Sequence, residues 1–99
     1  MKLVSASDFD QMLSNRIDFQ LIDVRENYEF EEHNAGGVNI PLSDVLSHAD
    51  QLNNDKKVVF CCKSGTRSAA MIHTLERKFG MQNLYYLEGG IESYFESKK

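Results

Sequence analysis

One short segment of the chain brings together a cysteine, a glycine and two cations. Residues 60–68 read Phe-Cys-Cys-Lys-Ser-Gly-Thr-Arg-Ser. Lys63 directly follows Cys62, a glycine comes three positions after it, and Arg67 comes five positions after it. A cysteine is a nucleophile in its thiolate form, which nearby cations and a helix N-terminus stabilise. We therefore predict that Cys62 is a reactive thiolate, open to solvent.

The segments on both sides of this loop are predicted to hold it at the edge of a sheet. Residues 57–60 form an apolar, β-branched run that is typical of a buried strand. From Ser68 to Phe79, apolar residues recur at helical spacing, and Gly80 follows as a stop. A strand, a tight turn and a helix N-terminus would surround Cys62 with backbone N–H groups.

The residues inside the loop fit this arrangement. Ser64 and Thr66 are small, and Gly65 can adopt φ values that other residues avoid, so several N–H groups can converge on an anion. The alternative is that Cys62 is a small buried hydrophobe at the end of a strand. We favour the reactive interpretation, because a packing cysteine needs no cationic, glycine-bearing loop.

The neighbouring cysteine is predicted to have a different role. Strand alternation points Cys61 to the opposite side of the sheet from Cys62, so we expect Cys61 to be a core residue. Counted from Cys61, the spacing to Arg67 matches the Cys-x5-Arg loop of protein tyrosine phosphatases, but the glycine is one position too late. Counted from Cys62, the glycine comes three positions later and the arginine five, which gives the pattern Cys-x-x-Gly-x-Arg-Ser.

Predicted strands and helices alternate along most of the chain. Strands are expected at residues 3–4, 19–24, 38–40, 57–60 and 83–87. Helices are expected from Ser5 or Ser7 to Asn15, over 25–33, from Ser43 or Asp44 to Leu52, over 68–79, and from Ile91 onward. We expect Tyr28 and Phe79 to lie on the packed faces of their helices. This alternation predicts an α/β fold with a mostly parallel sheet and a ligand site beyond the carboxyl ends of its strands.

Length and composition bound the class of protein. The 99 residues suffice for one domain, which we expect to span residues 1–99. A net charge of −4 argues against a nucleic-acid partner, because such binding needs a basic face. No apolar run approaches the roughly 20 residues of a membrane span. The N-terminal segment also lacks the apolar core of a secretory signal, so we expect a cytoplasmic protein.

The cysteines and histidines lack the spacing of a metal site. Cys61 and Cys62 are adjacent, which suits neither a disulfide framework nor a zinc site. The three histidines, His33, His48 and His73, are scattered along the chain. We therefore expect no bound metal.

Three ordered motifs resemble those of rhodanese-like sulfurtransferases. The loop that begins at Cys62 looks like the active-site loop of this family. Residues 21–26 and 39–42 look like its N-terminal signature, and residues 87–91 look like its C-terminal one. The resemblance covers nearly the whole chain and implies a mostly parallel sheet of about five strands with helices on both faces.

The resemblance implies that Cys62 is the catalytic sulfur carrier. Its thiolate would attack the outer sulfur of a donor such as thiosulfate, form a persulfide and pass that sulfur to a thiophilic acceptor. The donor would be a small anion, and the acceptor a thiol, a cyanide-like ion or a sulfur-accepting protein. Neither a metal nor an organic cofactor is implied.

The resemblance also suggests roles around the loop. The residues expected to bind the donor are Lys63, Ser64, Gly65, Thr66, Arg67 and Arg25. Lys63 would bind the anionic part of the donor, and Arg25 would be a cation at the rim. Asp23 and Ser68 are expected to support the loop.

Two roles remain open for Arg67. Its guanidinium would either face the substrate anion or pair with a carboxylate, such as that of Glu29 or Glu88, and brace the loop. The resemblance favours the bracing role.

Two other functions compete with sulfur transfer. The first is a cysteine-based phosphatase or arsenate reductase on a related fold, which would need a loop one residue longer to hold a tetrahedral oxyanion. The second is a non-catalytic rhodanese-like module that docks a partner or carries sulfur.

Overall fold

The computed structural model describes residues 2–15 and 17–99. Met1, which belongs to the expected domain and to the segment considered for a secretory signal, lies outside them. The strands are β1 (Lys2–Val4), β2 (Gln20–Asp23), β3 (Val38–Asn39), β4 (Val58–Cys61) and β5 (Leu84–Leu87). The α-helices are α1 (Ala6–Ser14), α2 (Asn27–Glu32), α3 (Thr66–Phe79) and α4 (Gly90–Ser97), and η1 (Leu42–Asp44) and η2 (Leu46–Gln51) are 3-10 helices.

The five strands form one sheet in which every pairing is parallel. Their order is β1-β5-β4-β2-β3, so β4 lies at the centre between β2 and β5. All four residues of β4 are buried, as expected for a strand covered on both faces. The predicted α/β fold with a mostly parallel sheet of about five strands is confirmed.

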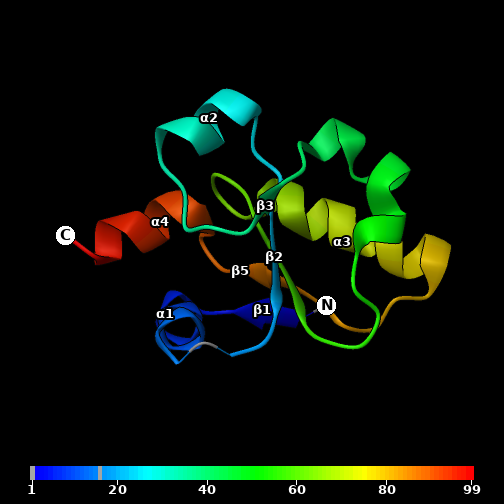
Figure 1. Cartoon of the computed structure of the whole chain (residues 1–99), viewed down its shortest axis with the longest axis horizontal. Helices are drawn as coiled ribbons and strands as arrows, with labels where there is room; N and C mark the ends of the chain where they lie inside the picture. The colour runs from blue at the N-terminus through cyan, green and yellow to red at the C-terminus, as the bar shows by residue number, and fades with distance from the viewer. Residues whose placement is uncertain (1, 16) are drawn as a thin grey trace.

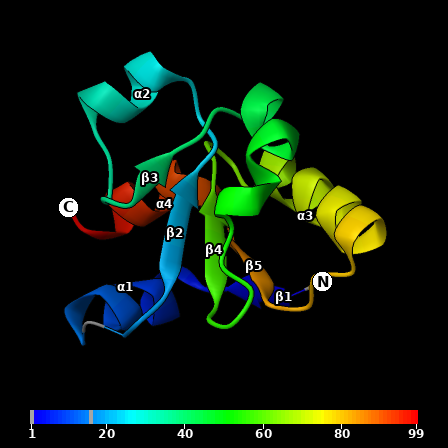
Figure 2. The same ribbon diagram turned by 45° about the vertical axis from the view of Figure 1, so that its right-hand side comes forward.

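Helices cover both faces of this sheet. α3, η1 and η2 pack on one face over the core cluster that contains Ile22, Phe60 and Ile72. α1 and α4 pack on the other face, over the cluster that contains Phe9 and Ile91 (Figure 1). α2 lies at the end of the sheet where β2 ends (Figure 2). None of the helices in the described ranges is long and apolar enough to cross a membrane.

The region expected to be a helix up to Leu52 differs from the prediction. It consists of two short 3-10 helices, and His48 has non-helical backbone angles inside the second. Val45 and Leu52 are buried, but Leu46 is 40% exposed. The apolar spacing therefore predicted the burial of Val45 and Leu52 correctly. The segment is too kinked, however, to form one helix with a continuous apolar face.

Two aromatic side chains lie on the surface instead of the predicted packed faces. Tyr28 is 68% exposed on the short helix α2, which contains no buried residue. Phe79 is 48% exposed at the last turn of α3. Helical periodicity predicted their direction wrongly because α2 covers only the edge of the sheet and α3 extends past it.

Candidate active site

A four-residue loop joins the central strand to the longest helix. β4 ends at Cys61 and α3 begins at Thr66, so residues 62–65 make the turn. Gly65 precedes the helix with φ 99°, in the left-handed region where side chains are disfavoured. The predicted strand, glycine-dependent turn and helix are present, although α3 begins two residues before the expected Ser68.

The backbone of this loop points two N–H groups at the Cys62 sulfur. The N–H of Gly65 donates to Cys62 Sγ at 3.0 Å, and the N–H of Ser68 donates to it at 3.4 Å. Both groups belong to the start of α3, where the helix dipole is positive. An anion at Sγ is therefore stabilised by two donors and by the helix terminus.

The sulfur lies deeper than expected. Cys62 has an exposed fraction of 0% and belongs to the core cluster that includes Phe60 and Ile72. The expectation of a thiol open to solvent is therefore wrong, because the turn folds over Sγ to direct its amides inward.

The two expected cations flank a surface groove beside the loop. Lys63 and Arg67 line an open cavity of about 740 Å³ together with Glu26, Tyr28, Glu29, Leu42, Ser43, Leu46 and Met71. Lys63 Nζ lies 3.9 Å from the carboxylate of Glu92, and both side chains are more than half exposed. Ser64 and Thr66 are exposed as well.

Arg67 does not have the predicted bracing contact. Within the described ranges, Arg67 has no ion pair, and Glu29 and Glu88 make none with it. Its side chain is exposed and contributes to the groove. Of the two roles left open by the sequence, the bracing ion pair is not formed in this structure, and the substrate-facing role stays a prediction.

Asp23 and Arg25 form a buried ion pair at the end of β2. Arg25 Nη2 lies 2.8 Å from Asp23 Oδ2, and Arg25 Nε lies 3.0 Å from Oδ1. Arg25 Nη2 also donates to the carbonyl of His33 at 2.7 Å. Burial alone would lower the pKa of Arg25, but the Asp23 carboxylate outweighs it and raises that pKa.

The expected rim position of Arg25 is therefore wrong. Arg25 is only 6% exposed, and its guanidinium is directed at Asp23 and at the end of α2. Residues two apart on a strand lie on the same face, but β2 ends at Asp23, and it is the bend after it that brings the two groups together. Sequence reasoning missed the pairing because the sequence does not show this bend. Arg25 links the end of β2 to the end of α2, and it does not line the groove beside Lys63 and Arg67.

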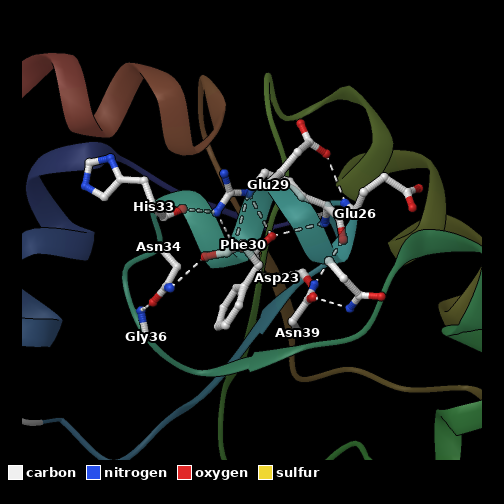
Figure 3. Close-up of polar contacts among 10 residues, drawn as sticks. Asp23, Glu26, Glu29, Phe30, His33, Asn34, Gly36 and Asn39 are labelled. Atoms are coloured by element: carbon white, nitrogen blue, oxygen red, sulfur yellow. Dashed lines mark hydrogen bonds and ion pairs between the residues drawn. The ribbon is translucent and has the colours of Figure 1, made fainter.

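Asn39 completes the polar network at this edge, as Figure 3 shows for the labelled residues around α2. Its amide nitrogen donates to the carbonyls of Asp23 and Arg25, both at 2.9 Å. Its amide oxygen accepts from Asn27 at 2.6 Å. Asn39 thus links β3, the end of β2 and α2. This contact follows from the pairing of β2 with β3, which places Asp23 beside Asn39. The sequence does not show that pairing, so it could not have predicted the contact.

Cys61 is a core residue, as predicted. It is 1% exposed and belongs to the cluster on the α1 and α4 face, opposite the cluster of Cys62. Burial raises the pKa of the Cys61 thiol well above its ordinary value, and the nearby Asp23 carboxylate raises it further. Cys61 is therefore held as a neutral thiol.

The start of α4 supports the loop in a way that the sequence analysis did not assign. The N–H of Ile91 donates to the carbonyl of Cys62 at 2.8 Å. Gly90 packs so closely that a Cβ there would overlap Lys63 and lie 2.6 Å from the Cα of Ser64. The two consecutive glycines after β5 were the available signal, and only the close approach shows why the second one is needed.

Comparisons with known proteins match this architecture. Residues 5–97 match the sequence model of the family described as the rhodanese-like domain. An uncharacterized protein of Bacillus subtilis (strain 168), YqhL, is 42% identical over 76 residues, which cover 76% of this chain and 60% of that protein. YrkF of the same organism, named as a candidate sulfur carrier protein, is 33% identical over 76% of this chain and 41% of its own length.

A solved structure and a larger enzyme extend the comparison. The crystal structure of a rhodanese-related protein from Thermoplasma volcanium has a TM-score of 0.84 and 32% identity, covering 98% of this chain and 93% of that chain. The tRNA uridine(34) hydroxylase of Photorhabdus laumondii is 32% identical over 92% of this chain and 27% of its own length. The chain thus spans only 27% to 60% of the lengths of these three curated relatives.

Proposed function

Because the chain belongs to the rhodanese-like domain family, we propose that it is a sulfurtransferase that carries sulfur as a persulfide on Cys62, within one domain over residues 1–99. The observation that carries this proposal is the pair of N–H groups, from Gly65 and Ser68, directed at Cys62 Sγ. Donors already placed around a sulfur stabilise negative charge there without reorganisation during the reaction.

The first step loads the sulfur. The Cys62 thiolate attacks the outer sulfur of thiosulfate, the S–S bond of thiosulfate breaks, and sulfite leaves with the electron pair of that bond. A new S–S bond joins Cys62 Sγ to the transferred sulfur. Atoms and charge balance without an external oxidant, so no cofactor is required.

The second step unloads it. A thiolate or cyanide attacks the outer sulfur, and the Cys62 thiolate leaves with the electron pair. The two N–H groups at Sγ stabilise this leaving thiolate as well as the attacking one. The same geometry therefore serves both halves of a ping-pong cycle.

The groove beside the loop is the proposed site for the donor anion. Lys63 and Arg67 line it, both are exposed, and Arg67 has no ion pair within the described ranges. Ser64 and Thr66 lie between them in the sequence, are exposed and carry hydroxyl donors, whereas the N–H of the buried Gly65 donates to Cys62 Sγ. Glu26 and Glu29 line the same groove, so the two cations also offset the repulsion that these carboxylates exert on an anionic donor.

A protein acceptor is consistent with the surroundings of the loop. Tyr28 and Leu46 are exposed apolar side chains that line the groove. The relative named as a candidate sulfur carrier protein supports a role in passing sulfur onward. We therefore propose a protein or small-molecule thiol as the acceptor.

A thiosulfate:cyanide assay tests the proposal, with formation of thiocyanate as the readout. Cys62→Ala is expected to abolish activity, because it removes the atom that carries sulfur. Cys61→Ala is expected to retain most of it, since Cys61 lies on the opposite face. Equal loss in both variants, with both folded, would contradict the assignment. Hydrolysis of p-nitrophenyl phosphate that depends on Cys62 would favour the phosphatase alternative.

A further inference from the structure

The hydroxyl of Ser68 is a buried polar group without a partner. Ser68 is 0% exposed, and its Oγ is the one buried side-chain oxygen or nitrogen within residues 2–15 and 17–99 that has no hydrogen bond. Leaving a buried hydroxyl unpaired is unfavourable, and native proteins do so rarely. This atom therefore calls for a functional explanation.

Thr74, on the same helix, shows how a hydroxyl in a helix commonly finds a partner. Thr74 Oγ1 donates to the carbonyl of Ala70, four residues earlier, at 3.2 Å. The equivalent acceptor for Ser68 would be the carbonyl of Ser64. Ser64 lies before the left-handed Gly65 and outside α3, so this helix-internal bond is not made.

The orphaned hydroxyl belongs to a residue whose backbone contacts the sulfur. The N–H of Ser68 already contacts Cys62 Sγ at 3.4 Å. A serine hydroxyl lies roughly 3 Å from its own amide nitrogen, because only two carbon atoms separate them. A second sulfur bonded to Sγ would extend about 2 Å beyond it, and in a rotamer directed toward α3 it would come closer to this hydroxyl.

Loading moves the negative charge outward by one atom. Before the reaction the charge is on Sγ, where the Gly65 and Ser68 N–H groups already meet it. When thiosulfate loses sulfite, Sγ becomes bonded to two atoms and neutral, and the outer sulfur carries the charge. That sulfur therefore needs a donor of its own.

We propose that the Ser68 hydroxyl donates a hydrogen bond to the outer sulfur of the Cys62 persulfide. Ser68 is then a catalytic residue as well as a support of the loop. This inference rests on the proposed function and adds to it the group that stabilises the intermediate. The hydroxyl is unpaired in the sulfur-free protein because its partner is the sulfur being carried.

The lifetime of the persulfide tests this inference. Wild type, Ser68→Ala and Thr74→Ala would be loaded with inorganic polysulfide, and the loss of the added sulfur followed by intact-protein mass spectrometry. Cys62→Ser, treated in parallel, identifies any sulfur added elsewhere. We expect the half-life of the persulfide to fall about tenfold in Ser68→Ala, since one hydrogen bond to a charged sulfur is lost. Thr74→Ala, whose hydroxyl is exposed on the same helix, should match wild type.

Thermal melting of the sulfur-free proteins supplies the second readout. Ser68→Ala should melt at the same temperature as wild type or higher, because it removes an unpaired buried hydroxyl. An unchanged persulfide half-life would overturn the inference. So would a Ser68→Ala chain that unfolds or melts lower, since the hydroxyl would then support the resting fold.

A thiosulfate arm separates this inference from the proposed function. If polysulfide loads Cys62 but thiosulfate does not, the proposed donor chemistry fails, while the comparison of half-lives still decides the role of Ser68. If neither reagent adds sulfur to Cys62 of the wild type, both proposals fail. If both reagents load it and the half-lives are equal, only the role of Ser68 fails.

Discussion

Two cysteines that are adjacent in the sequence meet opposite surroundings. Cys62 receives two backbone N–H groups at the start of a helix, whereas Cys61 lies in an apolar cluster next to the carboxylate of Asp23. Two N–H donors meet the first sulfur, whereas burial and a neighbouring carboxylate disfavour a negative charge on the second. A difference of one position at the end of β4 therefore gives the two thiols different surroundings, which is why we propose Cys62 and not Cys61 as the sulfur carrier.

Lys63 is expected to act on donor binding. Lys63→Ala should raise the KM for thiosulfate about three- to tenfold, because an exposed cation at the groove is lost. The effect should shrink at high salt, which screens exposed charges. Steady-state kinetics at low and high ionic strength measure it, with Lys78→Ala, an exposed lysine in the last turn of α3, as control. Equal KM values for wild type and Lys63→Ala would contradict the proposed donor site.

The buried ion pair is expected to matter for stability. Asp23→Asn should lower the free energy of unfolding by about 3–5 kcal/mol, because it leaves the Arg25 guanidinium buried without its carboxylate. Urea denaturation measures this change. Asp18→Asn is the control, since Asp18 pairs with Lys56 on the surface and should cost about 1 kcal/mol at most. Similar losses in both variants would show that burial of the Asp23–Arg25 pair does not increase its contribution to stability.

Among the elements, α4 supports the loop of residues 62–65 through backbone contacts. The N–H of Ile91 donates to the carbonyl of Cys62, and the N–H of Glu92 donates to that of Lys63. Gly90 allows the backbone of Lys63 and Ser64 to approach closely. A side chain at Gly90 would push the loop away from the helix. The position of the sulfur therefore depends on a contact between segments about 30 residues apart.

Replacement of Gly90 tests this contact. Gly90→Ala should lower the free energy of unfolding by about 2–4 kcal/mol, because it combines a clash with a positive φ. It should also reduce thiosulfate:cyanide activity, since the loop would shift. Gly36→Ala is the matched control: Gly36 also has a positive φ, but nothing lies within 4 Å of an added Cβ, so only about 1 kcal/mol is expected. Equal effects of the two variants on stability would argue against a close-packed loop.

A polar contact joins α4 to α1 and should depend on pH. Tyr94 and Lys98 each donate to Asp10 Oδ1 at 2.9 Å. The hydrogen bond from Lys98, and then that from Tyr94, hold the pKa of Asp10 below its ordinary value of 3.8. The carboxylate therefore stabilises the fold above the unfolded pKa, and this contribution is lost as the pH falls through the lower folded pKa.

Asp10→Asn should consequently melt at a lower temperature than wild type at pH 7. The difference should shrink as the pH is lowered below about 4 and vanish once the wild-type carboxyl group is protonated. Melting curves over this range measure it. A difference that stays constant with pH would mean that charge on Asp10 is not its cause.

For the whole molecule, local patterns predicted the elements better than their contacts. The strand, glycine turn and helix around Cys62 follow from residues that are close in sequence, and the parallel sheet follows from the alternation of elements. The Asp23–Arg25 pair and the burial of Cys62 depend on how β2, α2 and α4 meet, which no local spacing shows. Tyr28 was misplaced for the same reason, since helical periodicity does not reveal that α2 has little to pack against.

The overall arrangement places the Cys62 sulfur at the end of the central strand of the sheet. β4 is the middle strand, and elements from both halves of the chain surround its end: α2 from the first half, and α3 and α4 from the second. A buried sulfur at this junction is shielded from solvent. Shielding of this kind protects a persulfide from side reactions.

The central claim is that Cys62, and no other group, takes up one sulfur atom. Intact-protein mass spectrometry after incubation with thiosulfate tests it most directly. We predict that the wild type and Cys61→Ala each gain the mass of one sulfur atom, and that Cys62→Ser gains none. No gain by the wild type, or an equal gain by Cys62→Ser, would contradict the claim.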